Sequence, residues 1–266
     1  MSEVTTSDPN VINKLVEEIE DGSAVEIKTV APSNSQVELP GGFISKDGSL
    51  VKYAEVRELT GIDEEAISKS GSVGRALLTM LQRGLVSIGV EAATKEDIDN
   101  LLSGDRDAIL IGIRRVTFGD VVDFAFPCPA CNTDLVVHLD LNKDIPIRTL
   151  KDPFEDRTFE YTAKNGDVIS VSLPTGTTQK KLLENSDKTV AELNTILLAG
   201  CVQSINGFPI VGASSVLKLG MRDRDQIVTK ILAANPGPRL GEVQTACEAC
   251  GETTPMPLSL SDLFRL

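Results

Sequence analysis

The sequence contains no tryptophan and only one histidine, His138, among its 266 residues. Aromatic residues make up 4% of the chain, so a core must rest on Leu, Ile and Val, and little surface is available for stacking nucleobases. Every Ser-His or Cys-His nucleophile scheme would depend on that one imidazole, which we expect to lie on the surface of a strand. The protein is therefore predicted not to be an enzyme.

The sequence also lacks long apolar runs and an excess of basic residues, and we expect no secretory leader. No apolar run approaches the roughly 18 residues needed to span a bilayer, which argues against a membrane partner. The start, Met1-Ser2-Glu3-Val4, resembles no secretory signal and predicts a reducing compartment, where disulfides are uncommon. The 26 Lys and Arg against 39 Asp and Glu leave a net charge of -13, which disfavours a nucleic-acid partner.

Acidic pairs and glycine-rich turns offer few catalytic candidates. Asp105 with Asp107, and Asp223 with Asp225, stand where helices are predicted to begin, so we interpret them as helix-capping residues. The segment from Gly71 to Arg75 lacks the Gly-Lys-Ser or Gly-Lys-Thr ending of a phosphate loop.

Residues 1–38 differ in composition from the rest and are predicted to form an N-terminal arm. Residues 8–21 read as a short amphipathic helix, followed by a linker rich in Ser and Thr. We expect this helix to dock on a partner or on a second copy; the alternative is that it folds back onto its own domain or stays frayed. Its apolar face consists of Val11, Ile12, Leu15, Val16 and Ile19.

The remaining chain has the pattern of an α+β fold. Residues 43–59 read as two strands around an Asp47-Gly48 turn, and strand patterns recur on both sides of each Cys-x-x-Cys pair and over residues 157–173. Helices are predicted over residues 62–69, 72–89, 104–117, 176–185, 188–203 and 221–234.

Four short motifs occur twice in the same order, at an offset that drifts only from 115 to 119 residues. This regularity predicts a tandem duplication with halves at 39–150 and 151–266, packed as a pseudo-twofold pair. Convergent use of helix caps and turns is the alternative. The pairs are Leu59-Thr60-Gly61 with Pro174-Thr175-Gly176, Leu85–Ile88 with Val202–Ile205, Asp105–Ile109 with Asp223–Ile227, and Cys128–Cys131 with Cys247–Cys250.

The two Cys-x-x-Cys pairs carry the strongest chemical signal. Asn132 and Gly251, which tolerate a left-handed backbone, follow the pairs directly, as a metal knuckle at a hairpin tip requires. We expect the two knuckles to form one four-thiolate zinc ribbon holding a single structural Zn²⁺. Two disulfides or unbound buried thiols are the alternatives. The predicted ligands are Cys128, Cys131, Cys247 and Cys250, whereas Cys201 is predicted to be a core residue.

The distance along the chain between the two pairs, 115 residues, does not exclude such a site. Lengthening the loop beyond that of a compact ribbon costs about 1.5 to 2 kcal/mol, because closure entropy grows logarithmically. A structural zinc contributes roughly 10 to 16 kcal/mol in small peptides. The free energy of zinc binding would therefore exceed the cost of closing the loop. With four sulfur ligands the ion would have no open coordination position for chemistry.

The ordered motifs resemble a phage family over roughly residues 37–266. Together, Leu39-Pro40-Gly41-Gly42, Leu59–Glu64, Gly104-Asp105-Arg106 and the Cys128 knuckle are similar to the T-even-type baseplate hub assembly proteins, also described as baseplate hub assembly chaperones of contractile tails and injection systems. Gly41 stands where that family has the serine of its Leu-Pro-Ser opening.

The resemblance implies a non-enzymatic protein acting in the assembly or structure of the central baseplate hub. Its partners would be other phage tail or baseplate hub proteins, with a homo-oligomer as a further option. It would reside in the host cytoplasm during assembly and then either leave or stay in the virion tail baseplate. The alternative is an intracellular zinc-ribbon protein that binds nucleic acid, although neither cysteine pair encloses Lys or Arg and Glu248 lies within one of them.

Overall fold

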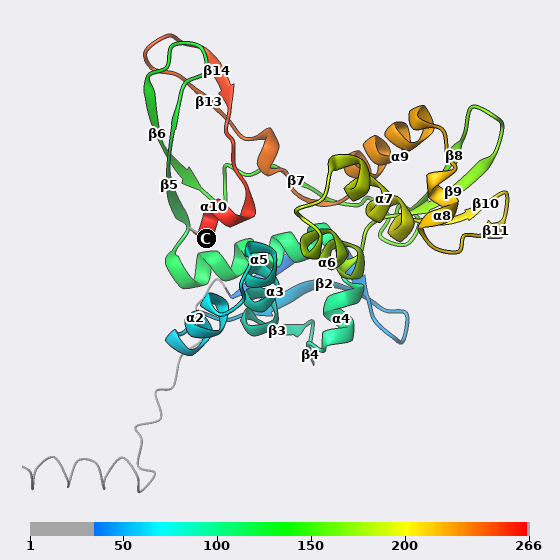
Figure 1. Ribbon diagram of the computed structural model, residues 1–266. Coiled ribbons are helices and arrows are strands. Elements are labelled where there is room, and N and C mark those ends of the chain that lie inside the picture. The colour runs from blue at the N-terminus through cyan, green and yellow to red at the C-terminus, as the bar shows by residue number, and fades with distance from the viewer. Residues whose placement is uncertain (1–34, 265–266) are drawn as a thin grey trace, which may run out of the picture. The chain divides into compact units, whose positions relative to one another are not determined.

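The structure, a computed structural model, describes residues 35–264, which fall within the second of the two units into which the chain divides, Pro32–Leu266. Helices and antiparallel sheets alternate along this unit, so the predicted α+β class is confirmed (Figure 1). The helix predicted over residues 8–21 lies outside the described residues.

The first αβ body is built on a four-stranded antiparallel sheet in chain order. Asp47-Gly48 forms the predicted turn between its first two strands, and Gly48 adopts a φ of 84° there. The apolar faces of α3 and α5 pack with the inner face of the sheet in one core, which includes Leu81, Ile109 and Ile113. The elements are β1 (Gln36–Ile44), β2 (Leu50–Val56), α2 (Gly61–Ser68), α3 (Val73–Gly84), β3 (Leu85–Ile88), β4 (Glu91–Ala92), α4 (Lys95–Asn100) and α5 (Ser103–Phe118).

The second αβ body repeats this element order and has a core of its own, which includes Ile169, Leu198 and Ile227. Its sheet has the strand order β11-β10-β9-β8, and the first three predicted motif pairs fall on elements that match in the two bodies. The elements are β8 (Thr158–Thr162), β9 (Val168–Ser172), α6 (Gly176–Glu184), α7 (Val190–Cys201), β10 (Val202–Ile205), β11 (Phe208–Pro209), α8 (Ala213–Leu217) and α9 (Met221–Ala234).

Two hairpins complete the described chain. Their apolar residues share one core with α5, to which Leu139, Met256 and Leu263 contribute. A short pairing of β7 with β12 joins the segment between the two bodies to the segment after α9. The elements are β5 (Val121–Pro127), β6 (Asp134–Asp140), β7 (Ile147–Arg148), β12 (Gly237–Pro238), the 3-10 helix η1 (Leu240–Glu242), β13 (Gln244–Ala246), β14 (Thr253–Pro255) and α10 (Leu260–Phe264).

The contact between the two αβ bodies is one-sided, which corrects the predicted pseudo-twofold arrangement for this part of the chain. The corner between β9 and α6 packs against the start of α5. Thr175 forms an isolated antiparallel β-bridge with Leu102, and the Gly176 N–H donates to the Leu101 carbonyl at 2.8 Å. A twofold axis would place the matching Thr60–Gly61 corner against the start of α9. Among the described residues, Gly61 instead has open space around its Cα.

Asp105 and Asp223 do not cap their helices, contrary to the prediction. The Asp105 carboxylate is fully buried and accepts the Gly41 N–H of β1 at 2.6 Å. Asp223 accepts the Tyr161 hydroxyl at 2.8 Å and the Lys164 N–H at 3.1 Å. Each carboxylate therefore ties the last long helix of its body to that body's first hairpin, a long-range role that a local sequence pattern does not reveal.

Burial of Asp105 predicts a pH-dependent stability. Desolvation raises its pKa to about 7, although the Gly41 N–H and the charge of Arg157 oppose the shift. Because the folded state then holds this proton more tightly than the unfolded state, the contribution to stability is fully present below about pH 4 and is lost as pH rises from there through about 7. Measured by urea unfolding, the free energy of unfolding of wild type should fall relative to that of Asp105→Asn by about 1 kcal/mol or more between pH 6 and pH 8. Parallel pH profiles for the two proteins would contradict this.

Candidate metal centre

Four cysteine sulfurs from two distant parts of the chain meet at the tips of the two hairpins. All four Sγ atoms lie within 4.8 Å of one another. Cys128 Sγ is 3.9 Å from Cys250 Sγ, and Cys131 Sγ is 3.6 Å from Cys247 Sγ. A tetrahedral zinc with Zn–S bonds of about 2.3 Å holds its sulfurs about 3.8 Å apart, so the cluster fits a four-thiolate metal ion. All four cysteines are free.

The two knuckles share one backbone design. In the first, the Asn132 N–H donates to the Cys128 carbonyl at 2.8 Å, and in the second the Gly251 N–H donates to the Cys247 carbonyl at 2.7 Å. Asn132 has a φ of 58° and Gly251 a φ of 74°, so both adopt the left-handed conformation that their sequence positions predict. This turn folds the chain back within one Cys-x-x-Cys segment and brings its two sulfurs together.

The strands hold each knuckle at the same register. Pro127 pairs with Asp134 directly before the first knuckle, and Ala246 pairs with Thr253 directly before the second. Each hairpin thus supplies one buried and one exposed cysteine: Cys128 and Cys247 are buried, whereas their partners face solvent. The buried sulfurs pack beside Leu135 and Phe126, which keeps water from one side of the cluster.

Local hydrogen bonds favour thiolates at the first knuckle. The hydroxyl and the N–H of Thr133 lower the pKa of Cys131 to about 6, and the N–H groups of Cys131 and Ala130 lower the pKa of Cys128. At the second knuckle, the Glu252 N–H also favours the thiolate, yet the neighbouring sulfurs raise the pKa of Cys250 to about 12. Four thiolates this close repel one another, and a bound divalent cation would remove that repulsion.

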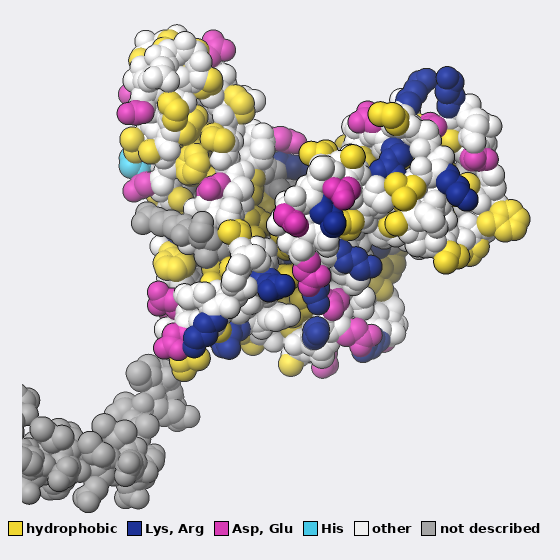
Figure 2. Space-filling view, viewed as in Figure 1, with side chains coloured by type: hydrophobic (Ala, Val, Ile, Leu, Met, Phe, Trp, Pro, Cys, Tyr) yellow, Lys and Arg dark blue, Asp and Glu magenta, His cyan; other side chains and the backbone are white. Residues whose placement is uncertain are grey.

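The remaining candidates from the sequence stay apart from this cluster. The His138 Nδ1 lies 2.6 Å from an Asp123 carboxylate oxygen on the exposed face of the β5–β6 hairpin, where the ring is visible in Figure 2. Cys201 is fully buried in the second core, and burial raises the pKa of its thiol to about 12. Among residues 35–264, the four cysteines form the one group of three or more His, Cys, Asp or Glu side chains close enough to share a metal.

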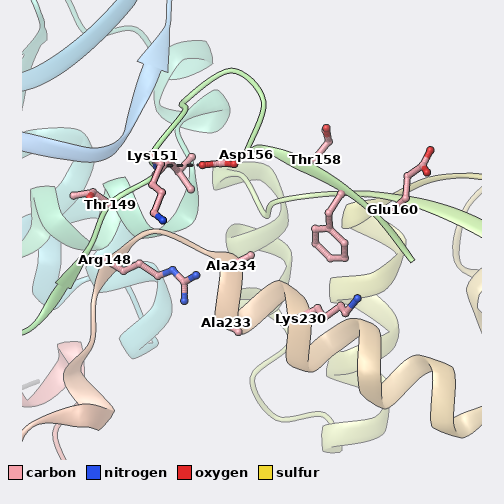
Figure 3. A pocket seen from close by; sticks show the side chains of 11 residues that line it. Arg148, Thr149, Lys151, Asp156, Thr158, Glu160, Lys230, Ala233 and Ala234 are labelled. Carbon is pink, nitrogen blue, oxygen red and sulfur yellow. Dashed lines mark hydrogen bonds between the residues drawn. The ribbon is translucent and has the colours of Figure 1, made fainter. Parts of the chain in front are cut away.

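A pocket of about 660 Å³ between β8, the end of α9 and residues 148–151 was not predicted. Arg148, Lys151 and Lys230 line it together with the acidic side chains of Asp156 and Glu160 (Figure 3). Asp156 accepts the Lys151 N–H at 3.1 Å. The cations come from segments about 80 residues apart in the sequence, so no spacing pattern could have joined them.

A comparison with protein families adds a biological context. Residues 85–209, a little under half of the chain, match the family model of the T4 bacteriophage base plate protein. The match is to a phage baseplate family. It runs from β3 to β11 and includes the first knuckle and parts of both αβ bodies. No curated protein and no solved structure matches the chain.

No helix in the described part of the chain is long and apolar enough to cross a membrane.

Proposed function

We propose that this protein is a non-enzymatic component or assembly chaperone of a phage tail baseplate, acting at the central hub and held together by one structural zinc. The observation that carries the proposal is the baseplate family match over residues 85–209, combined with the sulfur cluster. Its partners would be other tail or hub proteins, encountered in the host cytoplasm during assembly.

The geometry supports a structural role for the metal. With Cys128, Cys131, Cys247 and Cys250 as ligands, a zinc ion has four sulfur donors and no open position for water or substrate. The ion would clamp the hairpin of the first half to the hairpin of the second, beyond what their shared apolar core provides. Such a clamp suits a protein that must keep one shape while others assemble around it.

We also infer that residues 39–150 and 151–266 descend from a tandem duplication. The two halves share their element order, their sheet order and the register of their knuckles. The one-sided contact between the αβ bodies does not argue against this origin, because duplication copies the internal structure of a half and leaves its docking free to change.

A gene deletion in the phage tests the hub role. We expect lysates without this protein to lack assembled baseplates, and complementation in trans to restore them. Mass spectrometry of purified wild-type particles then separates the two forms of the proposal, since a permanent component is retained and a chaperone is absent. Normal baseplates in the deletion strain would refute both forms.

Filter binding at low salt tests the rival function, because tight retention of DNA or RNA would favour a nucleic-acid-binding protein.

A further inference from the structure

The contact between the two αβ bodies uses a corner of the second body and a face of the first. The matching corner of the first body and the matching face of the second take no part in it. Within the chain, the corner Pro174–Thr177 of the second body docks on the face formed by Ile98–Arg106 of the first. By the motif offsets, the matching corner of the first body is Leu59–Ile62, here called the free corner. The matching face of the second body is Val216–Arg224, here called the free face.

The free face exposes apolar side chains where its counterpart is buried. Leu217 is 61% exposed and Met221 is 88% exposed. Val190 at the start of α7, 73% exposed, belongs to the same surface, because Arg224 donates both to the neighbouring Ala191 carbonyl and to the Val216 carbonyl. In the first body, by contrast, the position equivalent to Met221 is the buried Ser103, and the position equivalent to Leu217 is the half-buried Asp99.

The free corner is equally open. Ile62 is 75% exposed, and an added Cβ on Gly61 would meet no atom within 4 Å. At the internal contact, the same position is Gly176, where an added Cβ would fall 2.4 Å from the Ile98 carbonyl oxygen and from Arg106 Nη1. A glycine is thus required sterically at the docked corner, whereas nothing in the described part of the chain requires the glycine of the free corner.

The unpaired backbone groups match as well. The internal contact uses two hydrogen bonds, from the Gly176 N–H to the Leu101 carbonyl at 2.8 Å and from the Ser103 N–H to the Pro174 carbonyl at 2.9 Å. The equivalent groups are the Gly61 N–H and Leu59 carbonyl on the free corner, and the Leu219 carbonyl and Met221 N–H on the free face. None of these four has a hydrogen-bond partner within residues 35–264.

Side-chain chemistry favours contact between the two free surfaces. Thr177 Oγ1 donates to the Asp99 carbonyl inside the chain, and the equivalent positions are the exposed Ile62 and Leu217, an apolar pair. Acidic side chains are exposed around the free corner, whereas the free face carries exposed bases. These opposite charges would steer the two surfaces together. The acids are Glu58, Glu64 and Glu65, of which Glu65 is paired with Lys69, and the bases are Lys218 and Arg222.

We propose that the free corner of one copy of this chain docks on the free face of a second copy, and so repeats the internal contact between molecules. The two surfaces differ, so the association is head-to-tail and continues until a ring closes or the chain of copies ends. This inference rests on the repeated αβ bodies and stands whether or not the protein acts in a baseplate.

Sedimentation velocity of the full chain across a range of concentrations tests the proposal. Wild type should form species larger than the monomer, and these should dissociate as salt rises, because the rim charges are exposed. Gly61→Ala, Ile62→Asp and Met221→Asp should each shift the equilibrium at least tenfold towards monomer. An Asp in the first turn of a helix is favourable, so the two Asp variants should stay folded. Val136→Asp, at an exposed position of β6 on the metal hairpin, is the matched control and should associate like wild type.

Mixing variants gives the sharpest readout. Ile62→Asp has a defective corner and Met221→Asp a defective face, so each alone should be monomeric, but the mixture should form 1:1 dimers and nothing larger. A symmetric contact would not be rescued in this way. A monomeric wild type at every concentration, wild-type association unaffected by these substitutions, or a mixture that stays monomeric would each overturn the proposal.

Discussion

Replacing Cys131 by Ser should abolish zinc binding and lower the melting temperature of the protein by many degrees. The cluster places four sulfurs within 4.8 Å, and a closed four-thiolate site does not retain its metal firmly when one ligand is lost. Structural zinc contributes roughly 10 to 16 kcal/mol in peptides that are unfolded without it. Here the hairpins keep a shared apolar core, so a loss of several kcal/mol is expected.

Metal analysis together with thermal unfolding checks this prediction. Wild type purified without chelator should contain one zinc per chain, and a strong chelator should lower its melting temperature to that of Cys131→Ser. Cys201→Ala is the control, because Cys201 lies in the second core, outside the cluster; it should keep one zinc and its response to chelator. A wild type with clearly less than one zinc per chain, or one whose melting is indifferent to chelator, would contradict the assignment.

The sequence was sufficient to predict the sulfur cluster because its determinants are local. Each Cys-x-x-Cys pair forms its own turn, and Asn132 and Gly251 mark the left-handed residues that close it. The strand patterns on both sides then place each turn at a hairpin tip. We predicted that the two tips meet because a structural zinc needs four ligands and each turn supplies only two thiolates.

Boundaries between helices and strands were less predictable. The helix predicted over residues 72–89 ends at Gly84, and Leu85–Ile88 is a strand paired with β2. The same error recurs where α7 passes into β10 at Cys201. Both short strands continue the apolar pattern of the preceding helix, so periodicity alone cannot separate them, and pairing with a strand distant in the sequence decides. The short helix α4 was missed, although Thr94 and Asp97 form a capping box at its start.

The arrangement of the two bodies could not be obtained from the repeat. Duplicated sequence predicts that the halves share an internal structure, whereas docking depends on surface residues in which the halves differ. Leu102 and Gly104 shape the covered face of the first body, and the equivalent positions of the second are Gly220 and Arg222. At these two positions the covered face has an apolar side chain and no side chain, whereas its counterpart carries the exposed, charged Arg222.

Gly104 is the position where a single methyl group should do most damage to the packing of α5 against the segment after α9. A Cβ added there would lie 1.6 Å from the Pro236 carbonyl oxygen and 3.1 Å from the Gly237 Cα. Both neighbours are backbone, so no side-chain rotation can relieve the overlap. The segment after α9 would have to move away from α5, which would strain the pairing of β12 with β7 and the path of the chain to the second metal knuckle.

We therefore expect Gly104→Ala to reduce the free energy of unfolding by about 3 kcal/mol, the upper part of the range for overpacked sites. The helix propensity gained by alanine would offset less than about 1 kcal/mol of this. Gly241→Ala is the matched control, since an added Cβ there meets nothing within 4 Å, and its effect should stay within about 0.5 kcal/mol. Urea unfolding of the zinc-loaded proteins measures both. Because the overlap is with backbone from the far side of the junction, equal stabilities for the two variants would mean that α5 and residues 236–237 do not pack as the structure places them.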